Sequence, residues 1–241
     1  MTAPDLPPSA HTRGDAPRYR YFDLIVGVFV TALITSNLVS AKVAEVGGHK
    51  IGCGIFVFPI SYIFGDVLTE VYGYARSRRV IWIGFASAAL ASLVFYVADV
   101  MPPSPDWPHQ GAFHTILGQL PRVVAASLVA YVIGEFANSF VLAKLKVATG
   151  GKHLWVRTIA STVVGQLVDS AVFYPLAFYG GAGGWPVSLV VEVAWNNYLI
   201  KCAVEALFTP LTYFVVARLK RAENEDVFDV DTDFNPLHLK G

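Results

Sequence analysis

Charged residues are scarce in this sequence. Lys, Arg, Asp and Glu together make up 15% of the 241 residues, against roughly 25% in an ordinary soluble domain. Hydrophobic residues reach 54%, and the few charges lie between long apolar runs. A soluble chain of this length needs a charged surface to stay dissolved. The composition therefore excludes an ordinary soluble domain and indicates an all-α, polytopic membrane protein.

Several chemical signatures are also missing. The sequence contains no GxxxxGK[ST] phosphate-binding loop, no HExxH zinc motif and no GxSxG nucleophile elbow. Its two cysteines, Cys53 and Cys202, lie far apart in apolar segments, so we interpret them as packing residues. The net charge is zero and no basic stripe carries interleaved aromatic residues, which argues against nucleic-acid binding. We therefore predict no enzymatic activity, no cofactor and no metal site.

Long apolar runs predict the membrane topology, because a spanning helix needs about 20 mostly apolar residues. Six segments are candidates. The second is short and contains Gly, Pro and polar residues, so a broken or partly re-entrant segment is an alternative there, and the last is longer than one span needs. The predicted spans are Phe22–Ala41, Ile51–Leu68, Val80–Val100, Pro121–Ala143, Thr158–Tyr179 and Val187–Ala217. The sequence thus predicts a bundle of about six transmembrane helices.

The distribution of Lys and Arg predicts the orientation, because these residues are retained on the cytoplasmic side. The 101–120 connection and the GGAGGWP loop contain neither residue, and only Lys42 and Lys50 lie in a loop expected outside. The other basic residues cluster in the remaining connections and tails: Arg13, Arg18, Arg20, Arg76, Arg78, Arg79, Lys144, Lys146, Lys152, Arg218, Lys220 and Arg221. We expect a protein of the inner (plasma) membrane with both termini in the cytoplasm.

Three segments flank or interrupt the spans. Residues 1–20 are rich in Pro, Ala and polar residues, which predicts a disordered cytoplasmic extension. The transmembrane domain follows over 21–219, and residues 220–241 form an acidic cytoplasmic tail. The 101–120 connection is Pro-rich and then amphipathic, with its apolar residues on one helical face: Phe113, Ile116, Leu117 and Leu120. It predicts an outer loop with a short interfacial helix.

Polar residues inside the predicted spans are informative, because an ionisable group at the bilayer centre costs roughly 2.5–3.5 kcal/mol. In the second span, Tyr62, Asp66 and Glu70 follow one another at four-residue steps and share a helical face. Pro59 is expected to break the backbone just before that face and free a carbonyl. A simpler interpretation pairs Asp66 and Glu70 with the arginines at 76–79 at the interface.

The fourth and fifth spans carry polar faces as well. Glu135 and Asn138 lie about one turn apart in an apolar stretch, where a helix–helix hydrogen bond competes with a ligand-binding role. In the fifth span, small and polar residues recur at four-residue steps up to Asp169, with Gln166 alongside. A packing seam of small residues explains Ser161 and Gly165 on that face but not Gln166 and Asp169.

The sixth span repeats the pattern. Asn197, Lys201 and Glu205 lie four residues apart, with Trp195 beside them. In one interpretation, Lys201 and Glu205 neutralise each other along the helix; in the other, they contact a ligand. Four spans that direct acids or amides inward exceed what a passive bundle needs. The pattern favours a polar cavity that binds and moves a small polar molecule.

Two long stretches carry a family resemblance. TSNLVSAKV and FPISYIFGDVLTEVYGYARSRRVIWIGF resemble the Asn-Lys and F-P-x-x-Y-x-x-x-D-x-x-T-E-x-Y-G signatures of the queuosine precursor transporters, a vitamin-uptake-type group of six-helix inner-membrane proteins. GEFANSFVLAKLK, RTIASTVVGQLVDSAVF, NNYLIKCAVEALFTPL and DFNPL extend the resemblance from Asp23 into the tail. The amino-terminal extension departs from the family pattern, which bears on localisation or regulation rather than transport.

The resemblance implies uptake of 7-deazaguanine precursors of queuosine, such as preQ0 and preQ1, across the lipid bilayer. A deazaguanine is flat, and its edge offers adjacent N–H donors that a carboxylate can accept. Glu135, Asp169 and Glu205 are the leading candidates for that contact, and Asp66, Glu70 and Lys201 complete the charged set. Amides suit the remaining edge atoms, and aromatic rings can stack on the face; these candidates are Asn138, Gln166, Asn197, Phe58, Tyr62 and Trp195.

Two other functions stay open. The chain could be the substrate-binding subunit of an ATP-driven vitamin-type uptake complex, since six-helix subunits of that kind exist and the chain has no ATP-binding loop of its own. A membrane enzyme is the second, although no recognisable catalytic motif supports it. The sequence leaves the oligomeric state open as well, and its small-residue helix faces would permit a homodimer.

Overall fold

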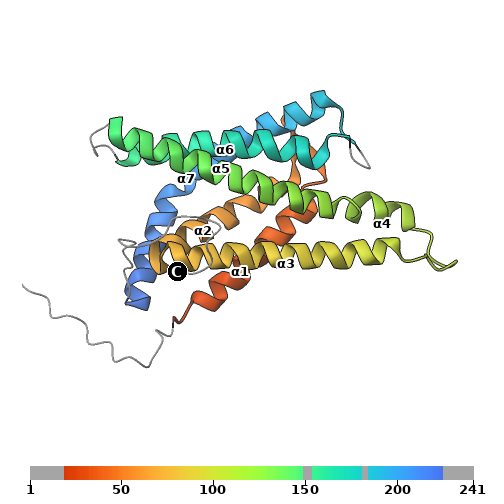
Figure 1. Cartoon of the computed structure of the whole chain (residues 1–241), viewed down its shortest axis with the longest axis horizontal. Helices are drawn as coiled ribbons and strands as arrows, with labels where there is room; N and C mark the ends of the chain where they lie inside the picture. Colours follow the sequence, from red (N-terminus) through yellow and green to blue (C-terminus); the bar gives the residue numbers. More distant parts are fainter. Residues whose placement is uncertain (1–18, 149–153, 181–183, 225–241) are drawn as a thin grey trace, which may run out of the picture.

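The computed structural model describes residues 19–148, 154–180 and 184–224 (Figure 1). The amino-terminal extension up to residue 18 and the tail beyond residue 224 lie outside the described residues. Helices account for almost all of the described chain. The elements are α1 (Phe22–Val39), β1 (Val43–Val46), β2 (His49–Gly52), the 3-10 helix η1 (Cys53–Phe56), α2 (Phe58–Tyr72), α3 (Tyr74–Val100), α4 (Gln110–Leu117), α5 (Leu120–Ala148), α6 (Leu154–Phe178) and α7 (Val187–Glu223).

The structure confirms the all-α, multi-pass architecture. Five helical segments are long and apolar enough to cross a membrane, and they fall on the first, third, fourth, fifth and sixth predicted spans. Large apolar side chains such as Leu90, 62% exposed, and Leu207, 74% exposed, lie on the outside of the bundle. In water such a surface would drive aggregation, but it suits contact with lipid. The bounds of the five segments are Phe22–Val39, Ala75–Val100, Gln110–Gly134, Ile159–Phe178 and Val187–Glu223.

The second predicted span, Ile51–Leu68, is wrong in its bounds. Its first residues end strand β2 and form the 3-10 helix η1, and the α-helix begins only at Phe58. Helix α2 has 15 residues, about 22 Å at 1.5 Å per residue, which is shorter than the hydrocarbon core of a bilayer. It packs instead against α1, α3 and α7, where Val67, Leu68 and Val71 are fully buried.

Pro59 does not break a helix, contrary to the expectation from its sequence. It lies in the first turn of α2, where a backbone N–H has no partner within the helix anyway and the fixed φ of proline suits the start of a helix. The backbone break follows α2 at Gly73, whose φ of 85° is readily adopted by glycine alone. Gly73 separates α2 from α3 and lets the chain reverse direction.

A β-hairpin, absent from the predicted elements, connects α1 to η1. Strands β1 and β2 pair antiparallel with Val46 opposite His49, and Gly47 and Gly48 form the two-residue turn. Both glycines have positive φ, 59° and 80°, as a tight hairpin turn requires. The hairpin is tied to α7 by an ion pair between Lys50 Nζ and Glu192 Oε2 at 3.0 Å.

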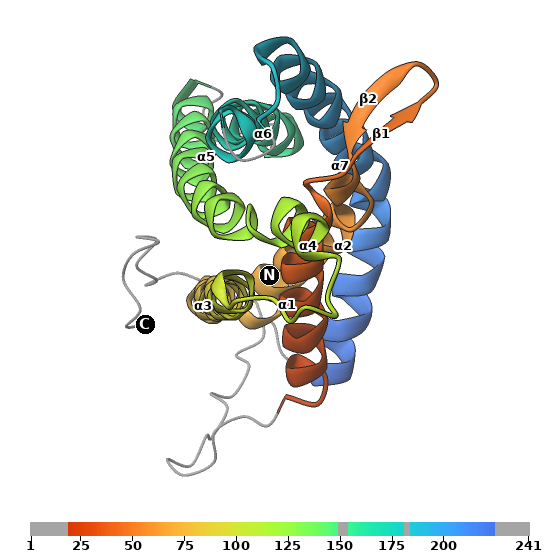
Figure 2. The same ribbon diagram turned by 90° about the vertical axis from the view of Figure 1, so that its right-hand side faces the viewer.

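The helices form two groups that α7 joins. Viewed along the long helices, α5 and α6 lie side by side, while α1, α2 and α3 form a second group (Figure 2). The first half of α7 packs on α6 and its second half packs on α2. The hairpin, α4 and the turn between α6 and α7 lie at one end of the bundle, opposite the α2–α3 turn (Figure 1). We call these the hairpin end and the opposite end.

The last helix also closes the bundle onto the first. The carboxylate of Glu223, at the end of α7, accepts hydrogen bonds from the backbone N–H groups of Arg20 and Tyr21, each at 2.8 Å. The Tyr72 hydroxyl at the end of α2 donates to the same carboxylate at 2.9 Å. Tyr21 and Arg20 directly precede the first residue of α1, so Glu223 fixes the start of α1 to the end of α7 and places a negative charge near the amino-terminal end of α1.

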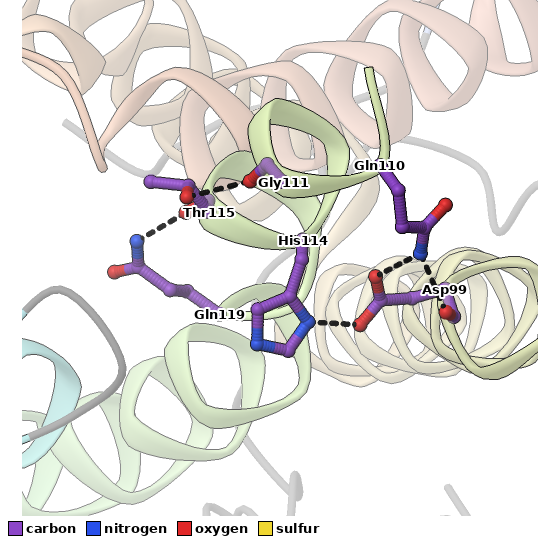
Figure 3. Close-up of polar contacts among 6 residues, drawn as sticks. All are labelled: Asp99, Gln110, Gly111, His114, Thr115 and Gln119. Carbon is purple, nitrogen blue, oxygen red and sulfur yellow. Dashed lines mark hydrogen bonds and ion pairs between the residues drawn. The ribbon is translucent and has the colours of Figure 1, made fainter. Parts of the chain in front are cut away.

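The short helix α4 confirms the helix predicted within the 101–120 connection. It is attached to the end of α3 through Asp99, whose side chain is only 6% exposed (Figure 3). His114 Nδ1 lies 2.6 Å from Asp99 Oδ2, and the Gln110 amide donates to the Asp99 backbone oxygen at 2.9 Å. Two side chains of α4 therefore converge on one residue of α3.

Replacing Asp99 tests this attachment. Asp99→Ala removes the acceptor for His114, so we expect the free energy of unfolding to fall by about 1–3 kcal/mol. The measurement is the thermal unfolding temperature of the purified protein in detergent. Asp106→Ala is the matched control, because Asp106 is exposed in the same connection. Equal shifts for the two variants would contradict the role assigned to Asp99.

Candidate functional site

Two glycines allow α5 and α6 to approach closely in the middle of the bundle. A Cβ atom on Gly134 would lie 3.2 Å from the Asp169 Cβ, and one on Gly165 would lie 3.0 Å from the Asn138 Cβ. Both distances are tighter than ordinary van der Waals contact between side chains. Small residues at helix crossings in membranes permit such packing. This crossing places Asn138 of α5 beside Gly165 of α6, and Asp169 of α6 beside Gly134 of α5.

Asp169 forms an ion pair with Lys201 of α7. The Lys201 Nζ lies 2.8 Å from the Asp169 Oδ2, and the two side chains are 7% and 21% exposed, respectively. A charge that is buried without a partner is far more costly than a paired one, so the pair neutralises both groups within the bundle. The spacing along α7 suggested Glu205 as the neutralising neighbour of Lys201; the structure adds a partner on another helix.

A second polar contact lies next to this pair, towards the hairpin end. The Asn197 amide of α7 donates to the hydroxyl of Tyr174 on α6. Its Oδ1 accepts from the Gly52 backbone N–H at 3.2 Å, and its Nδ2 donates to the Gly52 oxygen at 3.5 Å. Asn197 is 1% exposed and Tyr174 is 4% exposed. This contact joins the hairpin, α6 and α7 in one buried layer.

Three buried side-chain oxygens near these contacts have no hydrogen-bond partner among the described residues: Asn138 Oδ1, Gln166 Oε1 and Ser170 Oγ. Gln166 is 3% exposed and Ser170 is 2% exposed. Leaving a buried polar group unsatisfied costs about 1–3 kcal/mol. Groups of this kind in a native protein call for an explanation, and a polar ligand that binds among them provides one.

The antiparallel pairing of α6 and α7 extends the site by one further level. Tyr174 contacts Asn197, and Asp169 contacts Lys201. Gln166 precedes Asp169 by three residues on α6, and Glu205 follows Lys201 by four on α7, so each lies about one turn further from the hairpin end on its own helix. The site therefore consists of successive polar levels along the α6–α7 contact, with Asn138 of α5 on its flank.

The remaining predicted residues are distributed as follows. Trp195 is 53% exposed and its ring lies 5.5 Å from that of Tyr198, so it does not join the buried levels. Helix α2, which carries four of the candidates, packs against α7. The side chains of Phe58, Tyr62, Asp66, Glu70 and Glu135 lie outside the part of the chain that the structure describes.

Three residues of the site were not predicted: Gly52, Ser170 and Tyr174. Gly52 contributes only backbone groups, which leave no signature in a sequence. Ser170 and Tyr174 follow Gln166 at four-residue steps, so extending that face of the fifth span by two turns would have found them. Neither residue carries a charge, and for this reason neither stood out within an apolar segment.

Comparison with known proteins identifies the family. The family model described as "Putative vitamin uptake transporter" matches residues 52–215, more than half of the chain. The chain belongs to this transporter family. The matched region contains every residue of the polar levels, from Gly52 on the hairpin to Glu205 on α7. No solved structure matches the transporter.

Individual relatives agree with this assignment. The transporter is 30% identical over 192 residues to the "Probable queuosine precursor transporter" of Bacillus subtilis (strain 168), covering 78% of this chain and 82% of the relative. It is 26% identical over 196 residues to the "Queuosine precursor transporter" of Escherichia coli (strain K12), covering 80% and 86%. These names confirm the resemblance noted in the sequence, and they support the prediction that the chain is not an enzyme.

The close crossing of α5 and α6 can be tested by filling it. Gly165→Leu forces a side chain against Asn138 and the Gly134 backbone, so we expect destabilisation of at least 1–3 kcal/mol, roughly the cost of overpacking a core. The measurement is the unfolding temperature together with the yield of folded protein from membranes. Gly27→Leu is the matched control, since nothing lies within 4 Å of a Cβ at Gly27. A Gly165→Leu protein as stable as the control would contradict the close packing.

Proposed function

We propose that this protein imports queuosine precursors, 7-deazaguanine bases such as preQ0 and preQ1, across the inner membrane for tRNA modification. The observation that carries the proposal is the part-buried Asp169–Lys201 pair inside the helical bundle, together with the buried oxygens of Gln166 and Ser170 on adjacent turns of α6, which have no hydrogen-bond partner among the described residues. The names of the relatives supply the substrate class. Lys and Arg are concentrated in the terminal segments and in every second connection between the spans. This distribution supports cytoplasmic termini, which makes the hairpin end the outer end.

The chemistry of the site suits a flat base with both donors and acceptors on its edge. The Asp169 carboxylate can accept the adjacent N–H donors of a deazaguanine, as carboxylates accept paired donors elsewhere. The amides of Gln166 and Asn138 can each turn a donor or an acceptor towards the remaining edge atoms. We assign Glu135, Glu205 and Asn197 to the same site, and Phe58 and Tyr62 on α2 are proposed to stack on the face of the base.

Uptake in cells tests this assignment. We expect cells without their own queuosine synthesis to form queuosine in tRNA from a supplied labelled precursor only when they express this protein. Asp169→Asn loses hydrogen bonds to a charged acceptor, each worth about 1.5–3 kcal/mol, so uptake at low precursor concentration should fall roughly 10- to 100-fold. The measurement is labelled queuosine in tRNA, normalised to the amount of protein in the membrane.

Asp106→Asn is the control for that experiment, because it removes the same charge from an exposed position in the outer connection. Queuosine levels that are equal for Asp169→Asn and the unmodified protein would refute the site. No queuosine with the unmodified protein, despite verified expression, would refute the substrate class instead.

Reconstitution separates transport by this chain alone from transport by an ATP-driven complex. We expect the purified protein in liposomes to accumulate labelled preQ0 without ATP or a second subunit, because its polar site lies within a complete helical bundle. The measurement is the rate of uptake by filtered liposomes, compared with liposomes that lack protein. Binding of preQ0 without any uptake would instead favour a substrate-binding subunit that needs an ATPase.

A further inference from the structure

The partner of Asp169 in this structure is itself a cation of the protein. Lys201 Nζ occupies the position 2.8 Å from the Asp169 Oδ2, and its side chain is 7% exposed. A transporter must pass through states with and without substrate. An unpaired carboxylate in the lipid-embedded bundle is costly, so the empty state needs another group to satisfy Asp169. Lys201 meets that need.

We propose that Lys201 is an internal substitute for the substrate. Its ammonium group holds Asp169 in the empty transporter and leaves when the paired N–H donors of the base bind that carboxylate. This inference rests on the proposed function, because it assumes that Asp169 contacts the substrate. It assigns Lys201 a positioning role that acts on the substrate through Asp169 rather than by direct contact.

The structure offers acceptors for the displaced ammonium group. Glu205 follows Lys201 by one helical turn on α7, within reach of a flexible lysine side chain. Gln166 Oε1, about one turn before Asp169 on α6, is buried and has no hydrogen-bond partner among the described residues. The ammonium group can thus leave Asp169, move about one helical turn further from the hairpin end, and still find hydrogen-bond acceptors where water is excluded.

Two kinetic consequences follow from this exchange of partners. Lys201 competes with the substrate, so the apparent affinity of the unmodified transporter is lower than that of a site without the competitor. Lys201 also lets the empty transporter return, because Asp169 stays neutralised. Net uptake requires that return, whereas exchange of internal for external substrate does not. A variant that lacks the positive charge should therefore bind more tightly but transport mainly by exchange.

The test compares Lys201→Gln with Lys201→Arg in liposomes, using labelled preQ0, which has no charged side group. Glutamine can hydrogen-bond to Asp169 but cannot neutralise it. We expect Lys201→Gln to bind preQ0 roughly tenfold more tightly, to lose at least about tenfold in net uptake and to keep its exchange rate within about twofold. Lys201→Arg retains the charge and should keep net uptake within about threefold of the unmodified transporter.

Unchanged or weaker binding by a folded Lys201→Gln protein would overturn the inference, as would equal losses of net uptake and exchange. If Lys201→Gln does not fold, the double variant Asp169→Asn/Lys201→Gln replaces it, because it removes both charges of the pair. The proposal is then supported if the double variant does not bind preQ0 and Lys201→Arg takes up preQ0 normally. Loss of net uptake in Lys201→Arg would overturn it. An error in the proposed substrate class would be distinguished from these outcomes, because the unmodified transporter would then not bind preQ0.

Discussion

The cost of placing charged groups inside the bilayer organises this structure. Asp169 and Lys201 lie on different helices, and each charge is tolerated within the bundle because the other neutralises it. Their contact fixes the register between α6 and α7. The close crossing at Gly134 and Gly165 then fixes α5 against the same stretch of α6. Three helices are thus aligned around one ion pair, and the unsatisfied oxygens of Gln166 and Ser170 lie at neighbouring turns.

The β-hairpin shows how a membrane protein can bring backbone groups into a buried site. Strands β1 and β2 pair the N–H and C=O groups that face each other, and Asn197 binds both backbone groups of Gly52 at the end of β2. The Cβ that Gly52 lacks would lie 3.1 Å from the Asn197 Nδ2. The end of β2 therefore lies against Asn197 within the bundle, whereas the turn at Gly47 and Gly48 is exposed and projects away from the helices (Figure 2). Non-helical backbone is tolerated at such a depth only where protein surrounds it.

Much of the fold and part of the site were predictable from the sequence. Apolar runs of about 20 residues located five spans, and of the polar residues singled out within them Gln166, Asn197 and Lys201 are buried. Spacing along one helix carries no information about its register with another, which is why the Asp169–Lys201 contact was not foreseen. The bounds of the second predicted span were wrong for a different reason. Apolar residues at 51–57 continue those of α2, and hydropathy does not distinguish a strand and a 3-10 turn from a helix.

The Glu223 carboxylate, which binds the backbone at the start of α1, has a consequence for biosynthesis. The groups that it joins, Arg20 and Glu223, are 203 residues apart in the chain. The backbone at the start of α1 is therefore synthesised about 200 residues before the carboxylate that binds it. Until residue 223 has been added, the N–H groups of Arg20 and Tyr21 lack this partner, so the contact between the first and last helices forms only after all of the helices between them have been made.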